Sequence, residues 1–178
     1  MKVLIAAGGT GGHIYPGIAV AKEVMARDSE SEVLFVGTAR GLEKKIVPEA
    51  RKVIRQFRPH VVVGAGGYVS GPVLMMAAIM GVPTLVMDSN ALPGFTNRQL
   101  ARFVERAALT FEEALPFFGK KGIVTGNPVR AEFFDIPAKE RSGTFHVLIF
   151  GGSQGARAIN NAMIDALEKL DPYVDRLT

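Results

Sequence analysis

Short apolar runs alternate with longer amphipathic stretches along most of the 178 residues. The runs are rich in Val, Ile and Leu without polar alternation, which is typical of strands covered on both faces. The intervening stretches have the length and spacing of helices. We predict strands at 3–7, 32–36, 60–63, 83–87, 107–110, 123–125 and 145–150, and helices at 16–26, 41–50, 52–57, 72–80, 95–103, 112–118 and 156–170.

This order of elements predicts an α/β fold with a parallel sheet, because strands that alternate with helices form right-handed βαβ units. A polar stretch at 135–144 lacks an apolar period and is typical of a linker. We therefore expect a Rossmann-like domain at 1–134 and the start of a second one at 145–178. The order of strand, Gly-Gly-x-x-Gly and helix occurs in both parts, at Gly8–Gly12 and at Gly151–Gly155.

Composition narrows the function classes. The chain has a net charge of +4 and a pI near 9.5, but its basic residues are scattered, so we do not expect nucleic-acid binding. It has no Cys, which excludes disulfides and thiolate metal sites. No apolar run reaches the roughly 18 residues that a membrane span needs. We expect a cytoplasmic protein.

The first glycine loop, Gly8–His13, follows a predicted strand and precedes a predicted helix. Glycines let the backbone approach a ligand closely, and free N–H groups at a helix start favour phosphate. Such a loop also occurs where a tight turn serves packing alone. The helix dipole disfavours protonated His13, so a neutral imidazole there is suited to accept a proton or to donate to phosphate. Helix capping is an equal alternative for His13, and His60 and His146 are interpreted as structural.

Polar residues follow other predicted strands. Asn90 and Asn97 lie between a strand and a helix, at the edge where open parallel sheets bind ligands. They are candidates for hydrogen bonds to sugar hydroxyls, and for Asn97 helix capping is the alternative. Arg130 follows another strand and could bind a phosphate in a bidentate way or pair with a surface carboxylate.

Several chemistries lack their motifs. The sequence contains no Asp-x-Asp pair and no His/Asp/Glu cluster with metal-ligand spacing, so we expect no metal. Neither a Gly-x-x-x-x-Gly-Lys-Ser/Thr phosphate loop nor a Gly-x-Ser-x-Gly turn is present. The second predicted strand ends without a carboxylate, which argues against a nicotinamide dehydrogenase.

Taken together, the motifs resemble the MurG family, the N-acetylglucosaminyltransferases of peptidoglycan synthesis. The resemblance extends over nearly the whole chain, and five of its six stretches are specific in their residues and in their order along the chain. The stretches are GGTGGHIYPGIAVA (8–21), GLEKKIVPEA (41–50), GAGGYVSGPV (64–73), SNALPGFTNRQLA (89–101), TGNPVR (125–130) and FGGSQGARAIN (150–160).

The resemblance implies a GT-B fold, in which two Rossmann-like domains face a cleft. It also implies inverting, metal-independent transfer of N-acetylglucosamine from UDP-N-acetylglucosamine to undecaprenyl-diphospho-muramyl-pentapeptide, without a cofactor, at the inner face of the cytoplasmic membrane. His13 matches the family's loop histidine and is the candidate base. The family's donor contacts map onto Thr10, Gly11, Gly12, Asn90, Arg130 and Ser153.

The sequence departs from the family pattern in three places. Met87–Ser89 replaces the family's His-Glu-Gln, which puts an acceptor contact there in doubt. Between Ala50 and Arg51 the family carries a further strand, a membrane-associated loop and most of a helix. Beyond Thr178 the family carries most of its donor-binding residues. We therefore expect a family member shortened internally and at its C-terminus, and a non-catalytic fragment or scaffold with a partial phosphate site is the alternative to an active enzyme.

Overall fold

The computed structural model describes residues 1–9, 11–37, 46–137, 147–151, 156–170 and 172–173. The chain divides into two compact units, Met1–Ile136 and Pro137–Thr178. In the described residues, the first contains the sheet and five α-helices, and the second contains helix α6 (Arg157–Leu170).

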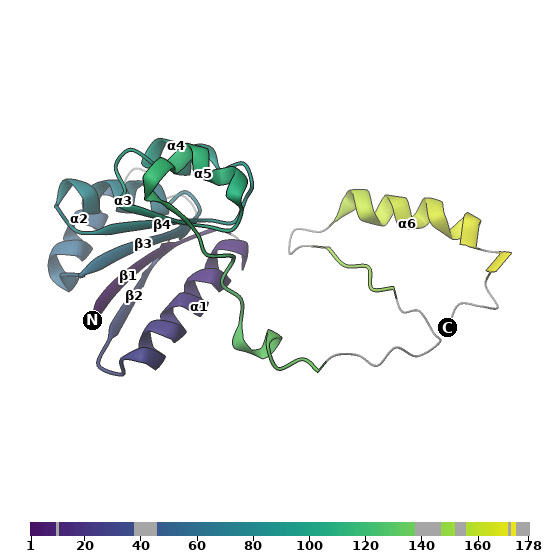
Figure 1. The fold of residues 1–178 in the computed structure, drawn as a ribbon, viewed down its shortest axis with the longest axis horizontal. Helices are drawn as coiled ribbons and strands as arrows, with labels where there is room; N and C mark the ends of the chain where they lie inside the picture. The colour runs from purple at the N-terminus through teal and green to yellow at the C-terminus, as the bar shows by residue number, and fades with distance from the viewer. Residues whose placement is uncertain (10, 38–45, 138–146, 152–155, 171, 174–178) are drawn as a thin grey trace. The chain divides into compact units, whose positions relative to one another are not determined.

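Six parallel strands form the sheet of the first unit (Figure 1). Its order, β2-β1-β3-β4-β5-β6, has a switch point between β1 and β3, because the chain moves to opposite sides of β1. Ligands of open parallel sheets bind at such a point, at the carboxyl ends of the strands. The strands are β1 (Lys2–Ala7), β2 (Glu32–Val36), β3 (Val61–Gly66), β4 (Thr84–Asp88), β5 (Arg106–Leu109) and β6 (Gly122–Val124).

Helices cover both faces of this sheet, which confirms the predicted α/β architecture. Helix α1 (Gly11–Arg27) lies on one face, and four helices lie on the other (Figure 1). Alternate residues of β1 enter the two cores: Val3 and Ile5 pack on the α1 side, and Leu4 and Ala6 pack on the opposite side. The four helices are α2 (Ile46–Phe57), α3 (Ser70–Ile79), α4 (Phe95–Leu100) and α5 (Leu115–Phe118).

Two helices differ most from their predicted bounds, and the ends of α3, α4 and α5 differ by one to three residues. Helix α1 begins at Gly11, before the predicted start at residue 16, so Pro16 lies inside it. Proline cannot donate to the carbonyl of Gly12, which lies four residues earlier, and Gly12 is exposed. Helix α2 runs without a break from Ile46 to Phe57, where two helices were predicted at 41–50 and 52–57, and 41–45 lie outside the described residues. Pro48 lies in its first turn, where the missing N–H breaks no internal hydrogen bond.

Of the two elements predicted in the second unit, the helix is observed. Helix α6 lies within the predicted range of 156–170. Residues 147–150 have no regular secondary structure, although a strand was predicted at 145–150, and 145 and 146 lie outside the described residues. A strand needs a neighbour to pair its backbone groups. The described part of this unit contains no strand that could be its partner.

Candidate functional site

The two glycine-rich loops meet at the carboxyl ends of β1 and β3. Gly66 and Gly67 have φ angles of 110° and 80°, which only glycine adopts readily. A Cβ atom at Gly67 would overlap the carbonyl oxygen of Gly8. The backbone of the second loop therefore packs directly on that of the first, in a way that no side chain permits.

His13 lies over the second loop. A Cβ atom at Gly66 would lie 2.8 Å from Cε1 and 2.9 Å from Cγ of the His13 ring, so the half-buried imidazole rests on the Gly66 backbone. His13 belongs to the first turn of α1, next to Gly11 and the exposed Gly12. The sequence placed these three residues together, but nothing in the sequence predicted Gly66 as the support of the ring. Thr10 lies outside the described residues.

Asp88 organises the loop that follows β4. The residue is 5% exposed, and its carboxylate accepts from the backbone N–H of Asn90 at 2.9 Å and from Asn90 Nδ2 at 3.1 Å. It also accepts from Asn97 Nδ2 at 2.8 Å and from the Gly94 N–H at 3.3 Å. Four donors thus surround one buried carboxylate. Asp88 holds the loop together, a role that the sequence did not reveal.

The two candidate asparagines differ in what they offer a ligand. Asn97 Nδ2 donates to Asp88 and also to the Met87 carbonyl at 3.2 Å, so both of its amide hydrogens are used. Among the described residues, the exposed Asn90 uses one amide hydrogen, and its Oδ1 atom and second hydrogen have no partner. Asn90 is therefore the better placed of the two for a sugar hydroxyl.

Arg130 lies beside the first turns of α1. Its guanidinium carbon is 5.6 Å from the centre of the Tyr15 ring and 5.2 Å from that of Phe133. Both distances permit cation–π attraction, which fixes the guanidinium without consuming its hydrogen-bond donors. The exposed Arg130 is thus available to an anion near the start of α1.

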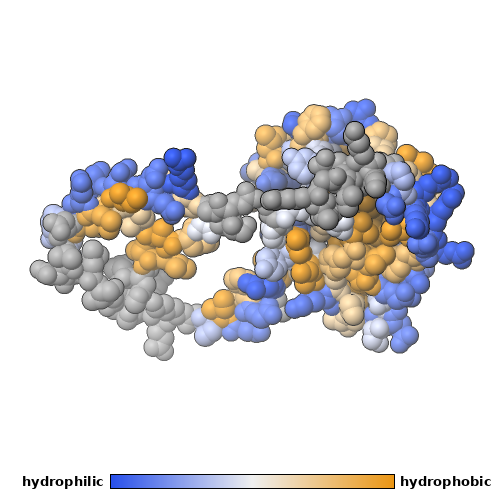
Figure 2. All heavy atoms as spheres, turned by 180° about the vertical axis from the view of Figure 1, so that it is seen from behind, coloured by the Kyte–Doolittle hydropathy of each residue, from blue (hydrophilic) through white to orange (hydrophobic). Residues whose placement is uncertain are grey.

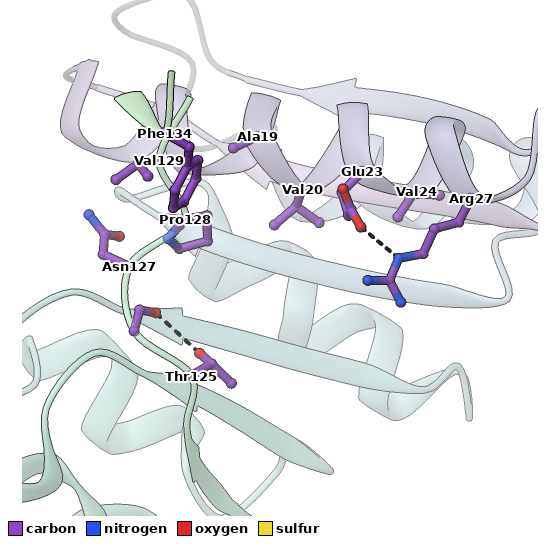
Figure 3. A pocket seen from close by; sticks show the side chains of 11 residues that line it. Ala19, Val20, Glu23, Val24, Arg27, Thr125, Asn127, Pro128, Val129 and Phe134 are labelled. Atoms are coloured by element: carbon purple, nitrogen blue, oxygen red, sulfur yellow. Dashed lines mark hydrogen bonds and ion pairs between the residues drawn. The ribbon is translucent and has the colours of Figure 1, made fainter. Parts of the chain in front are cut away.

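Two hollows lie next to these residues. A small cavity at the carboxyl ends of the strands is lined by Gly12, Pro16, Ala65, Met87, Asp88, Ser89, Ala108, Thr110, Thr125, Gly126, Asn127 and Pro128. A groove of about 580 Å³ extends from Val129 and Phe134 along α1 to the Glu23–Arg27 ion pair (Figure 3). The structure thus brings Gly11, Gly12, His13, Asn90, Asn97 and Arg130 to the same edge of the first unit. Ser153 lies outside the described residues.

Other features of the surface bear on ligands and partners. In the described ranges, no group of three or more His, Asp or Glu residues could hold a metal ion. None of the described helices has the length and apolarity that crossing a membrane would require. Three large apolar side chains, Tyr68, Phe95 and Leu92, are 86%, 70% and 64% exposed. Figure 2 shows hydrophobic surface between hydrophilic regions on one face of the protein.

The sequence matches a known domain family. The glycosyltransferase family 28 N-terminal domain matches residues 3–51 and 47–109. These two segments overlap at 47–51, where the sequence departs from the MurG pattern. Together they contain both glycine loops and the Asp88 loop.

Curated relatives match over most of the chain. The UDP-N-acetylglucosamine--N-acetylmuramyl-(pentapeptide) pyrophosphoryl-undecaprenol N-acetylglucosamine transferase of Syntrophus aciditrophicus is 45% identical over 204 residues, which cover 94% of this chain and 56% of the relative. The Myxococcus xanthus protein of the same name is 42% identical over 214 residues, which cover 99% of this chain and 56% of the relative. The chain thus spans about half the length of these relatives. Both alignments are longer than the 178-residue chain, so the relatives contain internal residues that it lacks.

Solved structures are similar in fold. The crystal structure of Acinetobacter baumannii MurG superposes with a TM-score of 0.71 and 28% identity, and the match covers 96% of this chain and 56% of that one. The UDP-GlcNAc 2-epimerase of Neisseria meningitidis superposes with a TM-score of 0.58 over 71% of this chain and 46% of that one. Its identity of 16% supports a shared fold alone.

Proposed function

Because this chain belongs to glycosyltransferase family 28 and is a homologue of MurG, we propose that it forms the acceptor-side part of an N-acetylglucosaminyltransferase. The reaction would transfer N-acetylglucosamine from UDP-N-acetylglucosamine to undecaprenyl-diphospho-muramyl-pentapeptide, with inversion and without a metal. One observation carries the proposal: in a family 28 domain, His13, both glycine loops, Asn90 and Arg130 gather at one sheet edge.

We assign a role to each residue of that edge. His13 is the base that deprotonates the acceptor hydroxyl, and its ring is supported by the Gly66 backbone. Gly11 and Gly12 present N–H groups at the start of α1, and Arg130 adds a guanidinium, so that both stabilise diphosphate charge. Asn90 binds a sugar hydroxyl. Thr10 and Ser153 are assigned to donor binding from the family resemblance, and Asn97 contributes to substrate binding through its Oδ1 atom.

The membrane surface is the proposed partner of α2. Arg51, Lys52 and Arg55 are exposed on this helix and line a groove of about 320 Å³. Each basic residue near an anionic leaflet contributes about 1 kcal/mol. We propose that the protein binds peripherally to the inner face of the cytoplasmic membrane through these side chains.

Vesicle sedimentation tests this partner. Binding to vesicles with anionic phosphatidylglycerol should exceed binding to phosphatidylcholine vesicles and should fall with added salt. Changing Arg51, Lys52 and Arg55 to Gln should abolish it. The matched control changes Arg98, Arg102 and Arg106 to Gln, since these are also exposed and carry the same total charge. Equal losses in both triple variants would show a net-charge effect and contradict a role for α2.

The second candidate function is that of a non-catalytic fragment. It is favoured for the chain by itself because the chain matches only about half the length of its relatives. The match includes 56% of the Syntrophus relative, and an enzyme needs both reactants fixed in one site. A chimera separates the candidates. It joins residues 1–134 to the remaining part of that relative, and transfer is measured with both substrates.

We expect the chimera to transfer the sugar, whereas the chain by itself does not. His13→Ala should lower turnover of the chimera by about 10²–10⁴-fold, as for the loss of a general base. His60→Ala is the control, because His60 lies at the opposite edge of the sheet, where its Nδ1 accepts from the Lys2 N–H at 2.8 Å. An unchanged rate in His13→Ala would remove His13 from the mechanism.

A further inference from the structure

The pairing of β1 with β3 contains an irregularity directly before the second glycine loop. Ala6 pairs with Gly64, but Ala7 pairs with Gly66, so Ala65 is passed over. An extra residue on one strand interrupts the ladder and bends the strand. Backbone groups next to it need other partners, because a buried unpaired N–H or C=O group is costly.

The hydroxyl of Ser70 supplies these partners. Ser70 is the first residue of α3 and is fully buried. Its Oγ accepts from the Gly66 N–H at 3.1 Å, and it lies 2.8 Å from the Ala6 carbonyl oxygen and 2.7 Å from that of Gly66. A hydroxyl both donates and accepts, so one side chain connects the end of β1 to the bulged end of β3.

Gly66 and the next residue, Gly67, support the first glycine loop. The Gly66 backbone lies under the His13 ring, and Gly67 packs on the carbonyl oxygen of Gly8. The backbone N–H of Ser70 donates to the Gly67 carbonyl at 3.2 Å, so Ser70 holds both glycines. A continuous series of contacts therefore leads from the Ser70 hydroxyl through Gly66 to the imidazole.

We propose that Ser70 is the positioning residue of His13: its hydroxyl fixes the bulge of β3, and the bulge sets the position of the imidazole. Ser70 touches no reacting atom in this account. The effect of Ser70 on the position of His13 is inferred from the observed contacts. Its consequence for catalysis rests on the proposed transferase function. A shift of about 1 Å in a catalytic group can cost about 10²-fold in rate.

The test is NMR of the imidazole C–H groups in the full chain. The protein has three histidines, so His60 and His146 serve as internal references for His13. Ser70→Ala should shift the His13 signals and leave the His60 signals in place. Ser70→Thr keeps the hydroxyl and should return the His13 signals toward those of the unchanged protein.

A second buried hydroxyl provides the matched control. Thr84 is 3% exposed, and its Oγ1 accepts from the Glu105 N–H at 3.2 Å at the amino end of β4, far along the sheet from the glycine loops. Thr84→Val removes a buried hydroxyl and should leave the His13 signals unchanged. If Ser70→Ala does not fold, Ser70→Cys keeps the side-chain size with a weaker donor and should still shift the His13 signals.

The outcomes distinguish the proposal from the proposed function. Unchanged His13 signals in a folded Ser70→Ala or Ser70→Cys variant overturn the positioning role, whatever the activity. Equal shifts in Thr84→Val also overturn it, because they show a general response to lost stability. In the chimera, Ser70→Ala should lower kcat by up to about 10²-fold with little change in KM. Shifted signals without any transfer by the unchanged chimera contradict the transferase function and leave the positioning role supported.

Discussion

Replacing Gly66 by alanine introduces a methyl group where the His13 ring already lies. The new Cβ would be 2.8 Å from Cε1 and 2.9 Å from Cγ of the imidazole. The backbone angle φ of 110° adds strain, because L-residues rarely adopt it. Gly81 offers a comparison: its φ is 71°, but a Cβ there meets nothing within 4 Å.

The two variants should therefore differ in free energy of unfolding. Backbone strain costs about 1–2 kcal/mol at Gly81, whose φ of 71° is close to the left-handed helical region, and at least as much at Gly66, whose φ of 110° lies further from it. The overlap with His13 adds an overpacking cost of about 1–3 kcal/mol at Gly66 alone. We expect a loss of about 2–5 kcal/mol for Gly66→Ala and of about 1–2 kcal/mol for Gly81→Ala.

A double-mutant cycle isolates the contact with His13. In a His13→Ala background the ring is absent, so Gly66→Ala should cost about 1–3 kcal/mol less than in the unchanged protein. Urea denaturation followed by circular dichroism measures all four proteins, with slopes compared to check that unfolding remains two-state. Additivity within about 0.5 kcal/mol would refute the packing of His13 on Gly66.

The remaining predictions concern two acidic side chains. Asp88→Asn should lower the free energy of unfolding by about 1–3 kcal/mol, because an amide nitrogen would face buried N–H donors. Urea denaturation measures this loss. The control, Glu113→Gln at an exposed position, should leave the free energy of unfolding nearly unchanged. Hydrogen bonds from the N-terminal ammonium, Ser31 and the Glu30 N–H hold the pKa of Asp28 below its ordinary 3.8. This contribution to stability is present above pH 3.8 and lost as pH falls through the lower folded-state pKa, and NMR titration should show the pKa rise when the N-terminus is acetylated.

The main layers of the fold were predictable from apolar runs. Val3–Ala7 and Val61–Val63 have no polar alternation, and such segments need cover on both faces, which the two cores around β1 provide. The start of α1 was predicted too late because proline is common in the first turn of helices. Pro16 instead lies inside α1, which begins directly after the glycine loop.

The supports of the candidate site were not predictable, because they depend on pairing between distant segments. The motifs indicated His13, Asn90 and Arg130 as separate strand-end residues, and the structure brings them to one edge. The contact of His13 with Gly66 depends on a one-residue slip in the pairing of β1 with β3, which leaves no local sequence signal. Ser70 lies two residues before the helix predicted at 72–80, and no local pattern singled it out.

The role of Asp88, where the sequence departs from the family pattern, was also not predictable from the sequence. The sequence showed a shorter carboxylate than the family's Glu and put an acceptor contact in doubt. In the structure this carboxylate accepts from Asn90, Gly94 and Asn97, so it shapes the loop. The direction of the Asp88 side chain decides whether it contacts a ligand or holds its own loop. Residue type alone does not reveal that direction.

Titration of the 178-residue chain with its two proposed substrates tests the central claim most directly. NMR follows the Gly11 and Gly12 amides and the His13 imidazole, using a soluble short-chain analogue of the lipid-linked muramyl-pentapeptide. Calorimetry follows UDP-N-acetylglucosamine. An acceptor-side domain predicts saturable shifts of the His13 imidazole with the acceptor analogue and no measurable binding of the nucleotide sugar. Micromolar binding of UDP-N-acetylglucosamine, with acceptor signals unchanged, would contradict it.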